Sequence, residues 1–198
     1  MYELYTIGHS NHTIERFFEL LSIHSITAIC DVRSSPYSKF NPQFNRETLR
    51  AELKRKSITY VFLGKELGPR SDDPACYVNG KVRYSALAKT DLFQQGLQRL
   101  RKGMKFYRIA LMCAEKDPIL CHRTILVCRQ LRDSGVNIRH ILDDGSIEEH
   151  PDSVRRLLRT LKLQDTNLFK SPDEIIEEAY DIQGEKIAYT EVDDSNKT

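Results

Sequence analysis

The chain has 198 residues, of which 40% are hydrophobic, so a single domain around one core is the default expectation. No apolar run approaches the length needed to cross a membrane, and the first residues lack the basic-then-apolar pattern of a signal peptide. Five cysteines without framework spacing indicate reduced thiols. We therefore expect a cytoplasmic protein without membrane contact, and the sequence makes no prediction of its oligomeric state.

Charge is distributed unevenly along the chain, although the net charge is only +2. Residues 33–108 contain 17 Lys and Arg against 6 Asp and Glu, a balance of +11. Residues 171–198 contain 2 basic and 9 acidic residues, a balance of −7. The basic middle favours an anionic partner such as phosphate, a nucleotide or a nucleic acid. A solvated basic helix face explains it equally well.

Five short apolar runs are predicted to be strands, at residues 4–8, 26–32, 59–63, 109–113 and 136–142. Helical spacing separates them: a helix is predicted after Thr13, another after Asn45, and two more over 87–100 and 121–131. Gly135 fits the C-cap of the last of these helices. Alternating strands and helices predict an α/β fold with a parallel or mostly parallel sheet of about five strands. Helices on both faces would make it three-layered and Rossmann-like.

The rest of the chain has weaker signals. The long connection 64–85 contains Asn79-Gly80, which predicts a small hairpin. Beyond Pro151 only helical patterns remain, and Ser171-Pro172-Asp173-Glu174 has the form of a capping box. Residues 190–198 are expected to be disordered. We therefore expect an α/β domain over 1–150 that carries the site. The helical, acidic C-terminal extension over 151–198, with its disordered end, is not expected to be an independent domain.

Reactive side chains concentrate where the predicted strands end, and in open α/β sheets ligands bind in the crevice beyond those ends. Histidines and carboxylates supply general acids and bases, and arginines bind anions bidentately. The candidate catalytic residues are His9, Asp31, Glu115, Cys121 and His122. The candidate anion-binding residues are Ser10, Arg33, Ser34, Arg70 and Arg123. Taken singly, each charged residue is explained as well by a surface ion pair.

Cys121 has further interpretations. Beside His122 and Arg123 at a helix start, its thiol would have a lowered pKa and act as a nucleophile. Positions 119 and 127 are Ile and Val, so the arginine that closes a phosphatase or rhodanese loop is absent. Cys113, Cys121 and His122 are also zinc-type ligands, although seven residues separate the cysteines and a fourth ligand such as His9 or Asp31 would be needed. A divalent metal is thus one alternative, and burial of both cysteines in the core is another.

These observations lead us to expect an enzyme, a hydrolase or transferase, that acts on a phosphate-bearing ligand, a nucleotide or a nucleic acid. The alternative is a non-catalytic module that binds nucleic acid or senses metal or redox state. Lys65, Glu66 and Arg70 are candidates for a lid, and Tyr84 for stacking or hydrogen bonding at the site. If the acidic tail covers the basic face, deleting residues 171–198 would raise the affinity for nucleic acid.

Four motifs then occur in an order that resembles the bacterial and archaeal family catalogued as domain of unknown function 488: TIGHSNHTIERFFELL, DVRSSPYSKFNPQFN, ELGPR and MCAEKDPILCHR. The resemblance covers roughly residues 4–142 and implies an α/β domain. It marks as signature positions Gly8, His9, Ser10, Asp31, Arg33, Ser34, Pro36, Cys113, Glu115, Cys121, His122 and Arg123. It implies no particular reaction, so the expected chemistry rests on the residues themselves.

Overall fold

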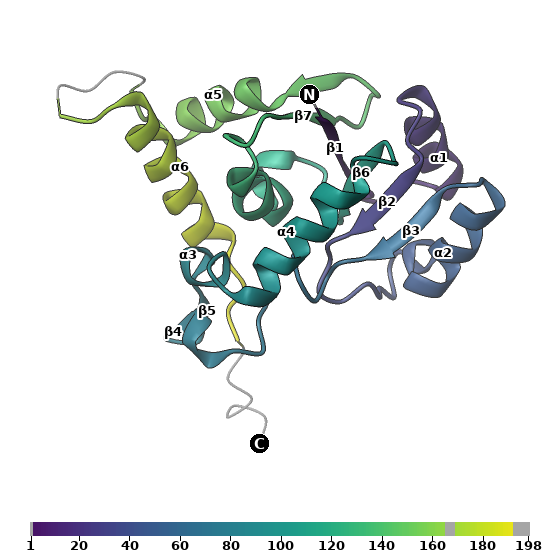
Figure 1. Ribbon diagram of the computed structural model, residues 1–198, viewed down its shortest axis with the longest axis horizontal. Coiled ribbons are helices and arrows are strands. Elements are labelled where there is room, and N and C mark those ends of the chain that lie inside the picture. The colour runs from purple at the N-terminus through teal and green to yellow at the C-terminus, as the bar shows by residue number, and fades with distance from the viewer. Residues whose placement is uncertain (1, 165–168, 192–198) are drawn as a thin grey trace.

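The structure, a computed structural model, describes residues 2–164 and 169–191. Its centre is a six-stranded sheet of order β3-β2-β6-β1-β7-β8 (Figure 1). The strands are β1 (Tyr2–Gly8), β2 (Ala28–Asp31), β3 (Thr59–Phe62), β6 (Ile109–Cys113), β7 (Val136–Ile141) and β8 (Ile147–Glu149). The first five are parallel, whereas β8 runs antiparallel to β7. The predicted, mostly parallel α/β sheet is therefore confirmed.

Strand order decides which loops meet. β6 lies between β1 and β2, and the register pairs Gly8 with Cys113 and Asp31 with Met112. The carboxyl ends of these three strands therefore lie side by side, although their residues are far apart in the sequence. The predicted site residues that follow them are brought to one edge of the sheet.

Helices cover both faces of the sheet, because the strand side chains alternate between two apolar cores. One core holds Tyr5 and Ile7 against α1 (Ile14–Ile23) and α2 (Arg46–Arg55). The other holds Leu4 against α4 (Asp91–Gly103), α5 (His150–Leu161) and α6 (Pro172–Ile187). The short α3 (Tyr84–Leu87) and the helical segment 118–131 pack on this second face as well. This is the predicted three-layer arrangement.

Four local predictions are confirmed by hydrogen bonds or backbone angles. The Thr13 side chain accepts a hydrogen bond from the amide of Arg16 at the start of α1. Asn79 and Gly80 both have positive φ and join β4 (Tyr77–Val78) to β5 (Lys81–Val82). Ser171 forms the predicted capping box at α6. Gly135 has the positive φ expected after a helix end.

Other boundaries differ from the prediction. The run 87–100 is not one helix, because the Thr90 hydroxyl caps α4 and separates it from α3. The run 121–131 is not a regular α-helix either. It consists of a π-helical turn η4 (Arg123–Val127) and a 3-10 turn η5 (Cys128–Gln130), preceded by the 3-10 turn η3 (Pro118–Leu120). Two further 3-10 turns are η1 (Pro42–Phe44) and η2 (Pro74–Cys76). The edge strand β8 was not predicted.

The C-terminal helices pack on the α/β layers. Ile175, Ala179 and Tyr180 of α6 are buried in the same core as Phe93 of α4. Thr190 forms a β-bridge with Lys81, although disorder was predicted from residue 190 onward. The rest of that predicted segment, 192–198, lies outside the described residues. Within the described ranges, no helix is both long and apolar enough to cross a membrane.

Candidate functional site

Four potential metal ligands converge at the carboxyl end of β6. They are Cys113, Glu115, Cys121 and His122, which we call the thiol cluster, and their ligand atoms all lie within 4.8 Å of one another. Cys113 is the last residue of β6, whereas Cys121 and His122 lie between η3 and η4. Both cysteines and the histidine are buried, and only Glu115 is exposed. The loop between β6 and η3 therefore folds back to join residues from its two ends.

The hydrogen bonds within the thiol cluster centre on Glu115. Its Oε2 accepts from Sγ of Cys113 at 2.9 Å and from Sγ of Cys121 at 3.0 Å. Burial raises the pKa of Glu115, but these two thiol hydrogen bonds act in the opposite direction and leave it below its ordinary value. Burial also raises the pKa of the Cys121 thiol. At neutral pH the cluster therefore contains an ionised carboxylate that accepts a hydrogen bond from at least one protonated thiol.

The orientation of His122 is fixed by the backbone of a neighbouring strand. Its Nε2 lies 3.0 Å from the carbonyl oxygen of Val32, which directly follows β2. A carbonyl only accepts hydrogen bonds, so Nε2 carries the proton and Nδ1 presents its lone pair. That Nδ1 lies 3.5 Å from Sγ of Cys113 and 3.9 Å from Sγ of Cys121. Metal-binding histidines are oriented in the same way, by donating their other N–H to a carbonyl or carboxylate.

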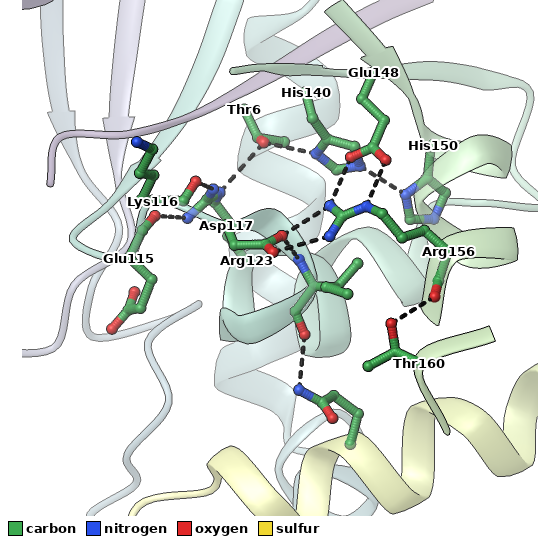
Figure 2. A network of polar contacts seen from close by, with 12 residues as sticks. Thr6, Glu115, Lys116, Asp117, Arg123, His140, Glu148, His150, Arg156 and Thr160 are labelled. Carbon is green, nitrogen blue, oxygen red and sulfur yellow. Dashed lines mark hydrogen bonds and ion pairs between the residues drawn. The ribbon is translucent and has the colours of Figure 1, made fainter. Parts of the chain in front are cut away.

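Arg123 holds the loop that carries the cluster (Figure 2). Its guanidinium donates to the carbonyl oxygens of Glu115 at 2.6 Å and Lys116 at 3.1 Å, and its Nε donates to the Thr6 hydroxyl at 3.3 Å. Figure 2 shows the Glu115 carboxylate pointing away from this guanidinium. Arg123 is fully buried. It was predicted to bind an anion, but here its donors are engaged by the protein.

Gly8 makes the same loop possible from the other side. A Cβ at this position would lie 2.0 Å from the carbonyl oxygen of Glu115, far inside contact distance. Only a glycine lets the end of β1 approach the backbone between β6 and η3 so closely. The signature glycine and Arg123 therefore act on one short piece of backbone.

The predicted residues at the ends of β1 and β2 form a separate buried network. Asp31 accepts from Nε and Nη2 of Arg33 at 2.9 and 2.7 Å, and from the Tyr60 hydroxyl at 2.8 Å. Nη1 of Arg33 donates to Nε2 of His9 at 3.1 Å, and Nδ1 of His9 in turn donates to the carbonyl of Ser10. Burial, assisted by Arg33, lowers the pKa of His9 to about 4. Asp31 and Arg33 therefore engage each other, and His9 is neutral at physiological pH.

The remaining anion-binding candidates lie nearer the surface. Ser34 lines a pocket of about 640 Å³ together with Lys65 and Arg70, and its buried hydroxyl has no partner within the described ranges. The guanidinium of Arg70 lies 3.8 Å from the centre of the Tyr189 ring. Among the described residues, the hydroxyl of Ser10 hydrogen-bonds only to the side chain of the neighbouring Asn11. The structure thus brings Ser34 and Arg70 to one pocket and leaves Ser10 apart from it.

A second pocket adjoins the thiol cluster. It measures about 770 Å³ and is lined by Glu115 and by charged residues of the loops after β6 and β7. Lys116 pairs there with Asp143 at 2.5 Å, and Arg156 pairs with Asp117 at 2.8 Å. Glu115 belongs both to this pocket and to the cluster. The cluster and the pocket therefore meet at this residue.

Two features of the surroundings were missed or only partly predicted. Tyr84 of α3 is 7% exposed, and its hydroxyl makes no hydrogen bond within the described residues. Tyr84 belongs to the same apolar core as Cys113 and Cys121. Burial, followed by the electrostatic effect of Cys121, Cys113 and Glu115, raises the pKa of Tyr84. A buried chain also links Thr6 to His140 at 2.8 Å, His140 to His150 at 3.0 Å and His150 to Tyr180 at 2.9 Å. The four residues of this hydrogen-bond chain come from β1, β7, α5 and α6, so no local sequence pattern predicts it.

The family comparison covers the cluster. The model of the domain of unknown function DUF488 matches residues 13–129, more than half of the chain, and this range includes every member of the thiol cluster and Arg123. Gly8, His9 and Ser10 precede it. No curated protein and no solved structure matches the chain. The match to the family model shows that the chain belongs to the family of the domain of unknown function DUF488.

Proposed function

We propose that this protein is a metal-dependent enzyme, a hydrolase or transferase, whose metal is held by Cys113, Cys121 and His122. The observation that carries the proposal is the convergence of two sulfurs, an oriented imidazole nitrogen and a carboxylate within 4.8 Å. Thiolate and imidazole ligands favour zinc. A tetrahedral zinc site places its sulfur and nitrogen ligands about 3.6 Å apart. The separations of 3.5 and 3.9 Å between the sulfurs and Nδ1 of His122 fit that geometry.

Glu115 is assigned the role of general base. Catalytic zinc sites commonly have three protein ligands and leave a fourth position for water or substrate. A bound metal would displace the thiol protons that hydrogen-bond to Glu115 in this structure. The Glu115 carboxylate would then be available to accept a proton from a water. Because Glu115 also lines the adjoining pocket, a substrate bound there would lie next to this residue. The free hydroxyl of Tyr84 supplies a donor for charge that develops on the substrate.

The substrate class follows from the charge distribution. The balance of +11 over residues 33–108 supports a phosphate-bearing ligand, a nucleotide or a nucleic acid. Arg33 and Arg123 are not assigned to it, because their donors are occupied by Asp31 and by backbone carbonyls. Lys65 and Arg70, which share a pocket with Ser34, are exposed cations that could bind it. A bound metal would polarise a phosphoryl oxygen of such a ligand.

Metal content tests the proposal directly. We expect about one zinc per chain by mass spectrometry of protein purified without a histidine tag, and loss of that zinc in Cys121→Ala. Cys128→Ala is the matched control, because Cys128 is fully buried in the same helical segment but lies outside the cluster. It should keep the metal. Absence of stoichiometric metal after zinc reconstitution, or retention of metal by Cys121→Ala, would overturn the proposal.

A metal-sensing module is the second candidate, and the burial of three of the four ligands favours it. Closed sites with four protein ligands are structural or sensory, whereas catalytic sites stay open. Glu115→Gln separates the two. In an enzyme the variant keeps its zinc and loses at least about 100-fold in turnover of a phosphoester panel. In a closed site it loses zinc affinity instead.

A further inference from the structure

We infer that the loop between β2 and α2 is a stacking platform for single-stranded nucleic acid. The platform consists of Tyr37 and Phe40 on the loop, together with the basic side chains Lys39, Arg46, Arg50 and Lys54. The inference rests on the proposed function in one respect: nucleic acid is chosen as the polymer because the proposed substrate class includes it. Binding to the platform itself requires no metal.

The aromatic side chains are held in solvent by an ordered loop. Phe40 is 94% exposed and Tyr37 is 55% exposed. The Ser38 hydroxyl accepts from the amides of Phe40 at 3.1 Å and Asn41 at 3.2 Å, and the Asn45 side chain accepts from the amide of Ser38 at 2.8 Å. These hydrogen bonds fix the turn on either side of Phe40. The ring is thus presented to solvent in a defined place, which lowers the ordering cost of binding.

Both ends of the loop are tied to the edge of the sheet that carries the thiol cluster. At its start, the carbonyl of Val32 holds His122. At its end, the ring of Phe44 stacks on His9 with centroids 4.4 Å apart, and its carbonyl accepts from Nη2 of Arg33 at 2.9 Å. A strand lying on the platform would therefore run along the carboxyl edge of the sheet, where the thiol cluster lies.

Positive charge accompanies the rings. Arg46, Arg50 and Lys54 follow one another at four-residue spacing along α2, and with Lys39 they make no ion pair within the part of the chain that the structure describes. Of the nearby carboxylates, Glu52 pairs with Arg55, whereas Glu47 accepts from the hydroxyl of Tyr37 and so lies beside that platform ring. Cations that follow a phosphate backbone, with aromatic rings for the bases, are the combination that binds single strands. A duplex keeps its base faces stacked and offers nothing to Phe40.

Fluorescence anisotropy with a labelled oligothymidylate of about twelve nucleotides tests the platform. Phe40→Ala should weaken binding by about 5- to 150-fold, the range measured for loss of one stacked base. Phe106→Ala is the matched control, because Phe106 is 82% exposed, follows Lys105, and precedes β6 at the opposite edge of the sheet. It should leave the affinity unchanged. The double variant Arg50→Gln, Lys54→Gln should lower the salt slope by about 1.4, or about 0.7 for each phosphate that is no longer neutralised.

The outcomes separate this inference from the proposed function. Equal affinity of wild type and Phe40→Ala, an equal loss in Phe106→Ala, or preference for a duplex of the same length over the single strand would overturn the platform. Zinc content measured on the same samples is independent of it. Stacking through Phe40 in protein that holds no zinc would support the platform and contradict the metal-dependent enzyme. Stoichiometric zinc without oligonucleotide binding would support the enzyme and contradict the platform.

Discussion

Arg123 illustrates how a residue type suggests one role and its surroundings another. An arginine beside a cysteine and a histidine is typical of anion binding. Here the guanidinium is fully buried and bridges two loop carbonyls and the Thr6 hydroxyl. The planar guanidinium can donate to three acceptors in fixed positions at once. The compact ammonium of a lysine cannot reproduce that geometry. We therefore regard Arg123 as a positioning residue for the loop that carries Glu115.

Arg123→Lys should lower zinc affinity by about 10- to 100-fold, the usual effect of losing a group that orients metal ligands. The loop between Cys113 and Cys121 loses the two donors that hold its carbonyls, so these two ligands converge less often. Competition with a chromophoric chelator measures the affinity. Arg139→Lys is the control, because Arg139 pairs with Glu149 and Tyr5, away from the cluster. Unchanged affinity in Arg123→Lys would show that the loop holds its shape without the guanidinium.

Among the elements, those with strong local signals were predictable, and those shaped by distant contacts were not. The five parallel strands and the Asn79-Gly80 hairpin are encoded by apolar runs and turn residues. The segment 121–131 has the apolar spacing of a helix, yet its first turns are π-helical where Arg123 is directed inward to the loop carbonyls. π-helical turns of this kind are frequent at functional sites. The three-residue strand β8 is too short for its pattern to be recognised.

The thiol cluster was also predictable only in part, because the fold of a loop places one of its members. Cys113, Cys121 and His122 are identifiable as ligands from their residue types, and the fourth was expected from His9 or Asp31. Both of those residues are instead engaged with Arg33. Glu115 takes the position beside the sulfurs, because the loop folds back on itself between β6 and η3. Nothing in the sequence shows which carboxylate faces the thiols.

Helix α6 tests the idea that the acidic tail covers the basic face. Glu177 pairs with Arg129 and Asp173 with Arg132, both outside the basic middle 33–108. Glu185, in contrast, pairs with Arg83 and Lys81, which belong to it. None of these cations belongs to the stacking platform. The buried side of α6 is part of the core. Deleting residues 171–198 should therefore destabilise the protein, and within the basic middle it would free Lys81 and Arg83 from their pairs with Glu185.

Tyr180→Ala measures the contribution of α6 to the core without truncation. Tyr180 is fully buried and bonds to His150, so we expect a loss of about 4 kcal/mol in the free energy of unfolding by urea. Glu178→Ala on the same helix removes only a surface pair with Lys170 and should change stability by less than about 0.5 kcal/mol. Similar losses in the two variants would contradict the packing of α6 described here.

At the scale of the whole molecule, the chain from Thr6 through His140 and His150 to Tyr180 links the central strand to the C-terminal helix. Arg123, which holds the loop of the thiol cluster, also donates to Thr6. This chain of hydrogen bonds is therefore connected to that loop. Burial lowers the pKa of His150 to about 4 and lowers that of His140 as well. Both histidines are therefore neutral in the folded protein at physiological pH, where each can donate with one nitrogen and accept with the other.

These buried histidines make stability depend on pH. In the unfolded chain a histidine has a pKa of about 6.5, so between about pH 6.5 and 4 the unfolded state binds more protons than the folded one. The stabilisation is complete above about pH 6.5 and is lost as the pH falls toward 4. For His150 alone, the loss between about pH 7.5 and 5 is about 2 kcal/mol. Urea unfolding at the two pH values should show His150→Gln losing about 2 kcal/mol less than wild type. Equal losses would mean that His150 is protonated as readily in the folded protein as in the unfolded chain.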